Sequence, residues 1–470
     1  MSRRKTTRRD FLKGTALSGA GIWLAGSAGC ADSKTGTPAA QAHRRMGRYK
    51  ANEKLNIAGV GVGGKGRSDI MKCHRENVIA LCDVDMNMAA GAIKRFGKAK
   101  RYHDYRVMFD ELGKDIDAIT CSTPDHMHTP VCVQAMRMGM HVYCQKPLTH
   151  DVYEARLMAQ TAKEYNVATQ MGNQGTAHDG LRSAVEAIRS GVIGNVTEAH
   201  VWTNRPVWPQ GMATPKGSDP IPTHLMWDLW VGTAPKRPYK GNRAYHPFAW
   251  RGWWDFGTGA LGDMGCHTAN MAFMALDLAS PTRASAECSG FEKDSFPTWS
   301  VITLDFPSRG KLPPLKWTWY DGGNDKPERV HKKLKSLIHG EKYAGSGSVL
   351  IGDKGTLYSP SDYGADWVLL PKADFEGWKP PAQTLPRIEG KAGIDQKQTD
   401  EWLAACKDPK KKTMSNFAYA GPLTETLLLG NIAMYTGKTI LWDGPKCEIT
   451  NCPEGQALVR RKYRKGWEQL

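Results

Sequence analysis

Residues 55–66 read LNIAGVGVGGKG, a short apolar strand that runs into a glycine-rich turn. A second apolar run, residues 78–82, ends at Asp83. The spacing Gly61-x-Gly63-x-x-Gly66 after a strand is typical of a dinucleotide-binding turn, and Asp83 lies 22 residues after Gly61. We therefore predict a nucleotide-binding α/β domain at this point in the chain.

The three glycines of the pattern have separate physical roles. Gly61 allows the tight turn, Gly63 lets the backbone approach a pyrophosphate, and Gly66 lets the helix pack close to the strand. The spacing Gly59-x-Gly61-x-x-Gly64 also fits the pattern. We prefer the later spacing because it places the first glycine at the end of the strand.

The residues that begin the following helix are further candidate cofactor contacts. Gly64, Lys65 and Arg67 lie where a helix N-terminus offers free N–H groups and a positive dipole end to phosphates. Asp83 is placed to accept hydrogen bonds from a ribose diol. Because a carboxylate there repels a 2′-phosphate, the sequence favours NAD slightly over NADP, although Lys65 and Arg67 keep NADP as an alternative.

The basic character of the chain comes mainly from its N-terminus. The 470 residues carry a net charge of +17, but residues 1–50 hold 11 lysines and arginines against 2 acidic residues. The positive excess elsewhere is mild and unclustered, so we expect no nucleic-acid partner. The length suits two or three domains.

The first residues resemble an export signal. Residues 7–13 read TRRDFLK, and a mildly apolar run of small residues follows over 14–29. This pattern predicts a twin-arginine signal peptide over residues 1–30 and a linker over 31–53. The apolar run is too short and too weakly hydrophobic for a stable membrane span. We expect a periplasmic or otherwise exported protein that engages the twin-arginine export machinery.

The 11 cysteines do not predict a disulfide framework. Several stand in or beside apolar runs, where cysteine acts as a small hydrophobe. The chain has no CxxC pair, and we expect no metal site. Pairing of Cys447 with Cys452 remains an alternative. Lipidation of Cys30 is disfavoured because Ser27, rather than leucine, stands three residues before it.

Strand-like and helix-like segments alternate over residues 54–172. This alternation predicts a Rossmann domain, a doubly wound parallel sheet with helices on both faces. Strands are expected over 55–60, 78–82, 117–121, 140–144 and 167–171, with helices starting near Arg67, Met86, Tyr105 and Pro130 and another over 151–165.

The character of the sequence changes after Gly172. Partial alternation with β-branched and aromatic residues predicts a C-terminal α/β domain over 173–445 with an open, mostly antiparallel sheet, followed by a tail over 446–470. Residues 208–251 are rich in proline and tryptophan and are expected to form a functional loop. The other expected elements are strands over 196–203, 284–289, 299–306 and 315–320, an exposed stretch over 321–347 and a helix over 418–434.

A polar loop, STPDHMH over residues 122–128, follows the predicted strand 117–121. Loops at the carboxyl ends of parallel strands line the ligand crevice. We expect Thr123 and Pro124 to flank a cofactor, and His126 and His128 to reach its ribose, its nicotinamide or a substrate. A metal site is not expected here because neighbouring positions in a tight loop rarely converge. A plain capping loop is the alternative.

The next strand runs into YCQKPL, residues 143–148. Pro147 stiffens the turn and fixes the direction of Lys146. A lysine beside a carbonyl–alcohol pair exchanges a hydrogen bond as hydride moves, with its pKa lowered by burial. We expect Gln145 and Lys146 to contact the cofactor and Lys146 to be catalytic, against the alternative of a surface lysine.

A third candidate segment contains Asp263 and His267, four residues apart. If a helix begins near residues 259–262, both side chains project from one face. A carboxylate and an imidazole on one face form a general acid/base pair. Taken alone, such a pair is more often a capping contact.

The ordered set of these motifs resembles the glucose–fructose oxidoreductase / inositol dehydrogenase family, Gfo/Idh/MocA. The resemblance spans about residues 54–445 and implies a Rossmann domain joined to a C-terminal domain through whose sheet members often oligomerise. It implies that Lys146 is the catalytic lysine, with Asp263 and His267 as partners and His267 as the proton acceptor. Where the family usually has Glu-Lys-Pro, this chain has Gln145-Lys146-Pro147.

Seven of the 16 tryptophans lie between Trp202 and Trp254. Aromatic faces stack on the apolar faces of sugar rings, so this segment indicates a carbohydrate or polyol pocket, with core packing as the alternative. The candidate substrate-binding residues are Asn173, Gln174, Arg205 and Trp254.

Together these features predict an exported NAD(P)-dependent oxidoreductase that acts on a sugar, glycoside or cyclitol hydroxyl. One alternative is a redox-neutral NAD-dependent glycosidase that oxidises its sugar transiently. Another is a sugar-binding protein that has no catalytic activity. Because little free NAD is expected outside the inner membrane, we expect a tightly bound nucleotide.

Overall fold

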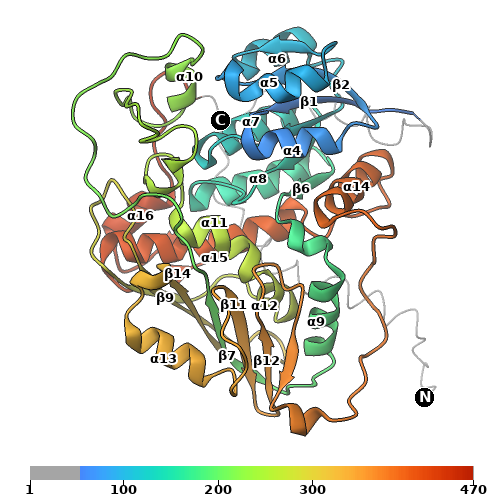
Figure 1. Ribbon diagram of the computed structural model, residues 1–470, viewed down its shortest axis with the longest axis vertical. Helices are drawn as coiled ribbons and strands as arrows, with labels where there is room; N and C mark the ends of the chain where they lie inside the picture. The colour runs from blue at the N-terminus through green and yellow to red at the C-terminus, as the bar shows by residue number, and fades with distance from the viewer. Residues whose placement is uncertain (1–52, 469–470) are drawn as a thin grey trace, which may run out of the picture.

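The computed structural model describes residues 53–468, and the predicted export signal and Cys30 lie outside the described residues. Two sheets are stacked end to end with helices between them (Figure 1). The first is parallel, in the order β3-β2-β1-β4-β5-β6. Its strands are β1 (Asn56–Val60), β2 (Asn77–Cys82), β3 (Lys100–Tyr102), β4 (Ala118–Cys121), β5 (His141–Cys144) and β6 (Thr169–Met171).

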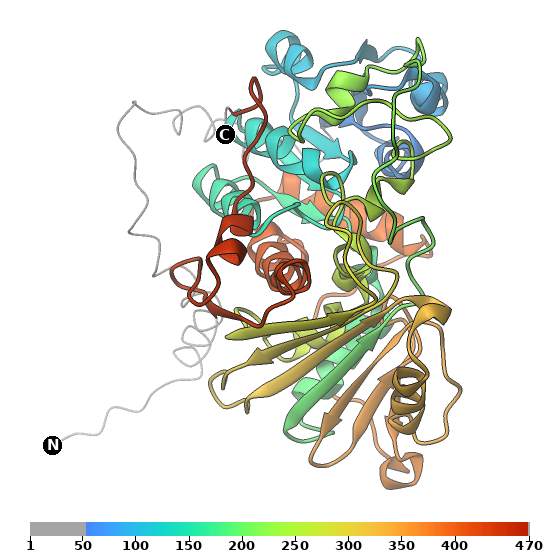
Figure 2. The ribbon, with the colours of Figure 1, turned by 90° about the vertical axis from the view of Figure 1, so that its left-hand side faces the viewer.

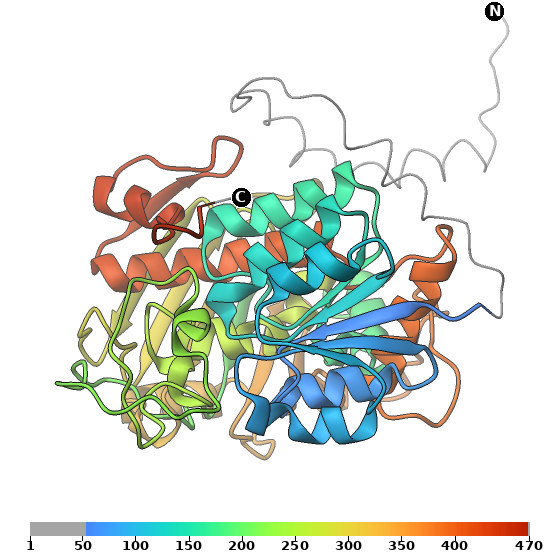
Figure 3. The same cartoon turned by 90° about the horizontal axis from the view of Figure 1, so that it is seen from above.

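Helices cover both faces of this sheet, which confirms the predicted Rossmann architecture. Helices α4 and α5 lie on one face, and α7 and α8 on the other (Figure 3). Aspartate side chains cap three of the N-termini, Asp85 on α5, Asp104 on α6 and Asp151 on α8. The helices are α4 (Gly64–Lys72), α5 (Met86–Arg95), α6 (Tyr105–Leu112), α7 (His128–Arg137) and α8 (Val152–Glu164), with the 3₁₀ turn η1 (Asp125–Met127).

The second sheet is mixed and mostly antiparallel, in the order β13-β12-β11-β7-β10-β9-β8-β14-β15 (Figure 2). Within this second sheet, β10 and β7 are the only described strands that pair in parallel. The strands are β7 (Val196–Trp202), β8 (Arg283–Cys288), β9 (Ser300–Phe306), β10 (Leu315–Asp321), β11 (Gly347–Gly352), β12 (Thr356–Ser359), β13 (Val368–Leu370), β14 (Ile440–Asp443) and β15 (Glu448–Ile449).

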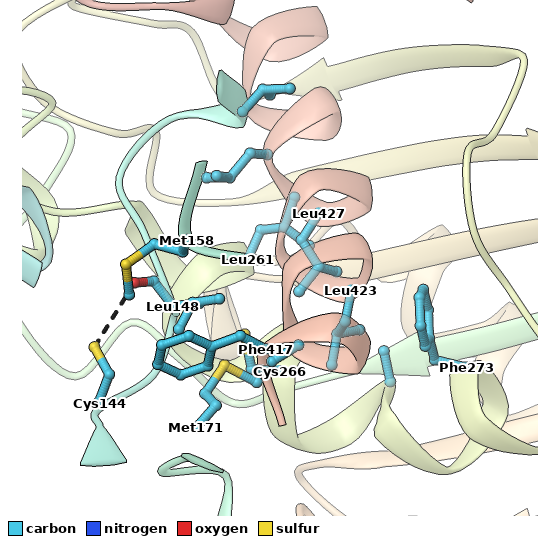
Figure 4. Close-up of a cluster of buried hydrophobic side chains, with 14 of the residues drawn as sticks. Cys144, Leu148, Met158, Met171, Leu261, Cys266, Phe273, Phe417, Leu423 and Leu427 are labelled. Carbon is cyan, nitrogen blue, oxygen red and sulfur yellow. Dashed lines mark hydrogen bonds between the residues drawn. The ribbon is translucent and has the colours of Figure 1, made fainter. Parts of the chain in front are cut away.

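A shared apolar core joins the two sheets. In Figure 4, Leu148 and Met171 from the Rossmann domain meet Leu261 of α11 and Phe417 and Leu427 of α15, and all five are almost completely buried. Full burial of such a side chain contributes about 1.5–3 kcal/mol, so the contact fixes α11 against the nucleotide domain. The remaining helical elements are η2 (Gln174–Ala177), α9 (Asp179–Arg189), α10 (Trp227–Val231), η3 (Ala249–Gly252), α11 (Gly259–Thr268), α12 (Asn270–Ala275), η4 (Gly323–Asp325), α13 (Glu328–Ser336), η5 (Lys372–Phe375), α14 (Ile394–Lys407), α15 (Phe417–Thr436) and α16 (Pro453–Val459).

Helix α14 returns from the C-terminal half to the Rossmann domain. Trp402 is fully buried in a cluster with Leu55 and Tyr143, and the Tyr143 hydroxyl donates to Gln398 Oε1 at 3.0 Å. This helix was not predicted from the sequence, because its buried side includes polar residues and its apolar face is narrow.

Residues 208–251 are more ordered than the predicted loop. They contain α10 and η3, and Trp227 and Trp230 stack at 4.6 Å in an aromatic cluster that includes Tyr245 and Phe256. The segment lies against the Rossmann domain, where Met226 N–H donates to Val84 O at 2.9 Å (Figures 1 and 2). Residues 321–347, predicted to be exposed, include α13, whose Val330 and Leu334 are buried.

Candidate functional site

One cavity of about 580 Å³ lies at the carboxyl ends of the parallel strands. The loops after β1, β2, β4 and β5 line it, as do the segment from Arg205 to Arg251, helix α11, Tyr363 and the tail residue Trp467. Ligands in doubly wound folds bind at this edge of the sheet. We call this space the central cavity.

The glycine turn has the geometry of the later spacing. Gly61 has φ +70°, and a Cβ on it would lie 2.8 Å from the backbone of Ser122. A Cβ on Gly66 would lie 1.8 Å from Gly61 O, so α4 packs against the turn only because position 66 is glycine. Gly59 stands inside β1 rather than at its end, which excludes the earlier spacing.

The turn also leaves space for a phosphate group. Gly63 is the N-cap of the nine-residue helix α4. Gly64 has φ +48° and nothing within 4 Å of its Cβ position. The first turn of α4 therefore presents backbone N–H groups to open space in the central cavity, as a pyrophosphate requires.

Asp83 braces the glycine turn from the end of β2. Its Oδ2 accepts from Val62 N–H at 2.8 Å and Gly63 N–H at 3.0 Å, and its Oδ1 accepts from Asp85 N–H at 2.9 Å. Burial raises the pKa of Asp83, while these backbone donors oppose the rise. Asp83 also lines the central cavity, so a contact with ribose stays a prediction.

The two cations predicted beside the phosphates lie in different surroundings. Lys65 lines the cavity, but its ammonium is held by Asp69 at 2.9 Å and Asp395 at 2.6 Å. Arg67 is exposed, and its guanidinium lies close to Gly91 of α5, away from the cavity lining. Arg67 therefore does not line the cavity, and its contact with the cofactor stays a prediction.

The two histidines of the polar loop lie behind the cavity rather than in it. His126 bonds the carbonyls of Trp230 and Phe256 at 3.1 and 3.3 Å. His128 bonds the carbonyls of Thr123 and Pro147, both at 2.9 Å. Both rings are completely buried against backbone carbonyls and neither lines the cavity, so their contact with a cofactor or substrate stays a prediction.

These buried rings nevertheless position predicted contacts that do line the cavity. Thr123 and Pro124 face the central cavity beside the glycine turn. His128 joins the loop after β4 to the loop that carries Lys146, because its two carbonyl partners belong to those loops.

Lys146, Asp263 and Arg251 form an ion-paired cluster in the cavity wall. Lys146 Nζ donates to Asp263 Oδ1 at 2.7 Å and to its carbonyl at 2.8 Å. Arg251 Nε donates to the same Oδ1 at 3.1 Å. Although burial acts to raise it, the charges of Lys146 and Arg251 lower the pKa of Asp263 to about 2. Arg251 carried no distinguishing signal in the sequence.

His267 lies one turn along α11 from Asp263, as predicted. Neither ring nitrogen has a hydrogen-bond partner among residues 53–468, and Nδ1 is fully buried. Its ring meets Tyr363 edge to face at 4.9 Å. Burial, followed by the charge of Lys146, holds the pKa of His267 well below its usual range, so the ring is a neutral proton acceptor at pH 7. Tyr363 was not predicted, because it stands in an irregular stretch without a motif.

Gln145 contacts a carboxylate on α4. Its Nε2 donates to Asp69 Oδ2 at 2.9 Å, and Ser122 Oγ donates to the same oxygen at 2.8 Å. Asp69 is almost completely buried. Where the family pattern has glutamate at position 145, this chain has an amide that faces an aspartate.

The four predicted substrate-binding residues divide into two pairs. Gln174 and Arg205 line the cavity near Tyr363, whose hydroxyl accepts from Gln174 Nε2 at 3.4 Å. Asn173 is buried behind the cavity and donates to Cys266 O at 3.2 Å. Trp254 packs on Phe296 and Tyr435 at another small pocket. Asn173 and Trp254 therefore do not occupy the predicted position.

Some tryptophans of the 202–254 segment line the central cavity, and others pack in the core behind it. Trp208, Trp230 and Trp250 line the central cavity. Trp227 and Trp253 lie in the aromatic cluster behind it. The predicted aromatic pocket is thus built from about half of these residues.

No disulfide links any of the described cysteines, so Cys447 and Cys452 are not paired with each other. Within residues 53–468, one group has metal-ligand spacing, namely the buried thiols of Cys121, Cys132 and Cys144, whose sulfurs lie within 4.8 Å of one another. They lie under β4 and β5, and the surrounding residues are apolar. No helix of the described chain has the length and apolar character that a membrane span requires.

The fold and the cavity define a two-domain, nucleotide-binding oxidoreductase architecture. Residues 55–173 match the family model for the NAD-binding Rossmann fold of the Gfo/Idh/MocA oxidoreductases, and residues 184–312 match the model for their C-terminal α/β domain. The chain belongs to the Gfo/Idh/MocA family.

Curated relatives match part of the chain. A glycosyl hydrolase family 109 protein of Solibacter usitatus is 29% identical over 206 residues, which cover 41% of this chain and 44% of that protein. A levoglucosan dehydrogenase of Pseudarthrobacter phenanthrenivorans is 27% identical over 116 residues, 25% of this chain and 29% of that enzyme. The chain thus spans less than half the length of these relatives.

Solved structures match the whole fold at low identity. A levoglucosan dehydrogenase in complex with NADH and levoglucosan matches with a TM-score of 0.54 and 16% identity, covering 83% of this chain and 99% of that one. The WlbA dehydrogenase of Bordetella pertussis in complex with NADH and UDP-GlcNAcA matches with a TM-score of 0.57 and 15% identity, at the same coverage.

Proposed function

We propose that this protein is an exported, NAD-dependent oxidoreductase that transfers hydride between a nicotinamide and a sugar, glycoside or cyclitol hydroxyl. The observation that carries the proposal is the position of Lys146, Asp263 and His267 in the wall of the cavity that the glycine turn also lines. A nicotinamide bound there would supply the hydride acceptor.

The residues of the chain manage the proton of the alcohol. His267, neutral and without a partner, accepts the hydroxyl proton. Lys146 stabilises negative charge that develops on the substrate oxygen, because its ammonium is directed by Asp263. Arg251 holds Asp263 from its other side and keeps the carboxylate ionised.

Three features support NAD over NADP. Asp83 and Asp104 line the end of the cavity beside β2, where a 2′-phosphate would meet negative charge. Lys65 is committed to Asp69 and Asp395, and Arg67 lies outside the cavity lining.

A redox-neutral glycosidase is the second candidate function. It is favoured because the segments that cover the cavity would retain a bound nucleotide. Buried Asp85, next to the cavity, accepts from His224 and His246 of the 208–251 segment at 3.0 and 2.8 Å. Trp467 of the tail also lines the cavity and lies 4.3 Å from the Arg106 guanidinium. A nucleotide under these elements exchanges slowly, so each catalytic cycle must restore it in place.

The test begins with the nucleotide in the purified protein. We expect mass spectrometry to find NAD that survives dialysis, and sugars and polyols to reduce it with an absorbance rise at 340 nm. A chromogenic glycoside that releases its leaving group without net NADH would select the glycosidase. Retention of activity in both His267→Ala and Lys146→Ala would refute the site assignment.

A further inference from the structure

The catalytic end of the central cavity carries more positive than negative charge. Lys146 and Arg251 share one carboxylate, that of Asp263. Arg205 lines the same cavity and has no carboxylate within ion-pair distance in the described part of the chain. His267 adds no negative charge, so a ligand here meets a surplus of cations.

Arg205 is directed by neutral contacts only. Its Nη1 donates to Asn204 Oδ1, its backbone N–H donates to Thr203 Oγ1 at 3.4 Å, and its carbonyl accepts from Gly322 N–H at 2.7 Å. These contacts fix the backbone at the end of β7 and leave the charge of the guanidinium uncompensated.

Arg251 lies close to two aromatic rings. Its guanidinium lies 4.3 Å from the Trp250 ring and 4.7 Å from the Phe248 ring. Nε bonds Asp263 and Nη1 bonds Phe248 O, which leaves Nη2 without a described acceptor. A stacked guanidinium is a preorganised donor for a carboxylate or phosphate.

Arg205 lies close enough to His267 and Tyr363 to act on both rings. Burial and Lys146 first, and then Lys65 and Arg205, lower the pKa of His267. Burial, Asp362 and Asp395 raise the pKa of Tyr363, and Arg205 and Lys65 oppose the rise. Arg205 therefore acts on the two rings that flank the reacting hydroxyl, whereas the phosphates are expected at the glycine turn.

The lysine and arginine donors of this wall are not compensated in charge by a neutral sugar. A sugar hydroxyl accepts a hydrogen bond from these donors but brings no negative charge. A carboxylate or phosphate only accepts, and its charge offsets the surplus. The wall is therefore complementary to an acceptor group with a negative charge.

We infer that the substrate is a sugar that carries an anionic group, a sugar acid or a sugar phosphate, and that Arg205 and Arg251 bind this group while the hydroxyl to be oxidised faces His267. The inference rests on the proposed function and narrows its substrate class. Arg205 is the specificity-determining residue, because Arg251 has the additional task of holding Asp263.

The experiment compares matched sugars with the purified protein and its retained nucleotide. Glucose, glucuronate and glucose 6-phosphate form one series, and galactose with galacturonate forms another. We expect kcat/KM for one anionic member to exceed that for the neutral sugar by about 10- to 100-fold, as one charge-assisted contact of about 1.5–3 kcal/mol allows. Comparing glucuronate with glucose 6-phosphate identifies whether a carboxylate or a phosphate group is bound.

The variants separate recognition from chemistry. Arg205→Gln is expected to raise KM for the anionic sugar about 10- to 100-fold with little change in kcat, and Arg205→Lys is expected to recover part of the loss. Arg329→Gln, an exposed arginine on α13, is the matched control. Equal kcat/KM for neutral and anionic sugars, or an equal loss for both in Arg205→Gln, would overturn the inference.

Direct binding distinguishes this inference from the proposed function. Calorimetry with glucuronate, glucose 6-phosphate and glucose needs no turnover. If no sugar reduces the nucleotide but an anionic sugar binds in an Arg205-dependent way, the proposed function fails and the anionic specificity stands. If neutral sugars are oxidised and bind as tightly as anionic ones, the proposed function stands and the anionic specificity fails.

Discussion

Three buried histidines lie around the central cavity, and they differ in what their ring nitrogens contact. Both ring nitrogens of His126 and of His128 face backbone carbonyls, and a neutral ring donates its one N–H to one of the two. His267 is almost as deeply buried, but neither of its nitrogens has a partner in the described chain. The three residues are therefore alike in type and in burial, and they differ in that only His267 has ring nitrogens without a partner in the described chain.

This difference separates a positioning role from a chemical one. A histidine whose nitrogens are both bonded to backbone stabilises the loops that it joins. A buried histidine without a partner costs free energy in the resting protein and is kept where a ligand completes it. The first description fits His128, between the loops after β4 and β5, and the second fits His267.

Replacement of His267 is expected to have the largest effect on turnover. His267→Gln removes the proposed base and should lower kcat/KM by about 10²–10⁴-fold, because general base catalysis contributes that much. The thermal midpoint should change little, since the ring makes no hydrogen bond to lose. Single-turnover reduction of the retained nucleotide, followed at 340 nm, measures the chemical step.

His128→Gln is the matched comparison. It removes at least one carbonyl contact in the core and should lower the free energy of unfolding by about 1–3 kcal/mol while leaving the chemical step nearly intact. Denaturant titration alongside the same single-turnover assay gives both numbers. A stable His128→Gln protein with a lost chemical step would break the distinction between the two histidines.

A second expected effect concerns Gln145, whose side-chain amide donates to buried Asp69. Gln145→Glu places a second carboxylate against buried Asp69 and should cost about 1–3 kcal/mol and weaken nucleotide retention. Adding Asp69→Asn restores an amide–carboxylate pair with the charge on the other side.

The double variant should therefore recover part of the stability and retention that Gln145→Glu loses. Chemical denaturation and the nucleotide content after dialysis are the two measurements. If Asp69→Asn makes the Gln145→Glu protein worse, the contact between these two side chains is not what determines the amide at position 145.

The comparison also shows what the sequence could predict. The Rossmann strands and the Asp263–His267 face followed from local patterns, apolar runs, glycines and a spacing of four, because those features are fixed within a few residues. The burial of His126 and His128 could not be predicted, because their carbonyl partners, at Trp230, Phe256 and Pro147, become neighbours only in the fold.

The site residues that sequence reasoning missed were missed for the same reason, since their contacts form only in the fold. Arg251 contacts Asp263 across the end of the 208–251 segment, and Tyr363 reaches His267 from beyond β12. Helix α14 packs on a domain more than 200 residues earlier in the chain. Contacts of such separation leave no periodicity or motif to detect, so sequence reasoning recovers the element that carries a functional side chain more readily than its partners.

The smallest expected effect is on the titration of His267, and it tests why this ring is a base. Burial and the charge of Lys146 lower its pKa, while Asp263 acts to raise it. Lys146→Gln should therefore raise the pKa of His267, and Asp263→Asn should lower it further. In the wild-type protein the lowered pKa keeps the ring neutral below pH 6.5, so kcat/KM for alcohol oxidation should stay level through that pH and fall only at more acidic values. Nitrogen NMR of histidine-labelled protein, with the His267 signal assigned through His267→Gln, measures the shifts directly. Opposite directions in the two variants would establish that the ion pair adjusts the pKa that burial lowers, whereas an unchanged pKa in both variants would mean that burial alone sets it and that Lys146 and Asp263 act only on the substrate.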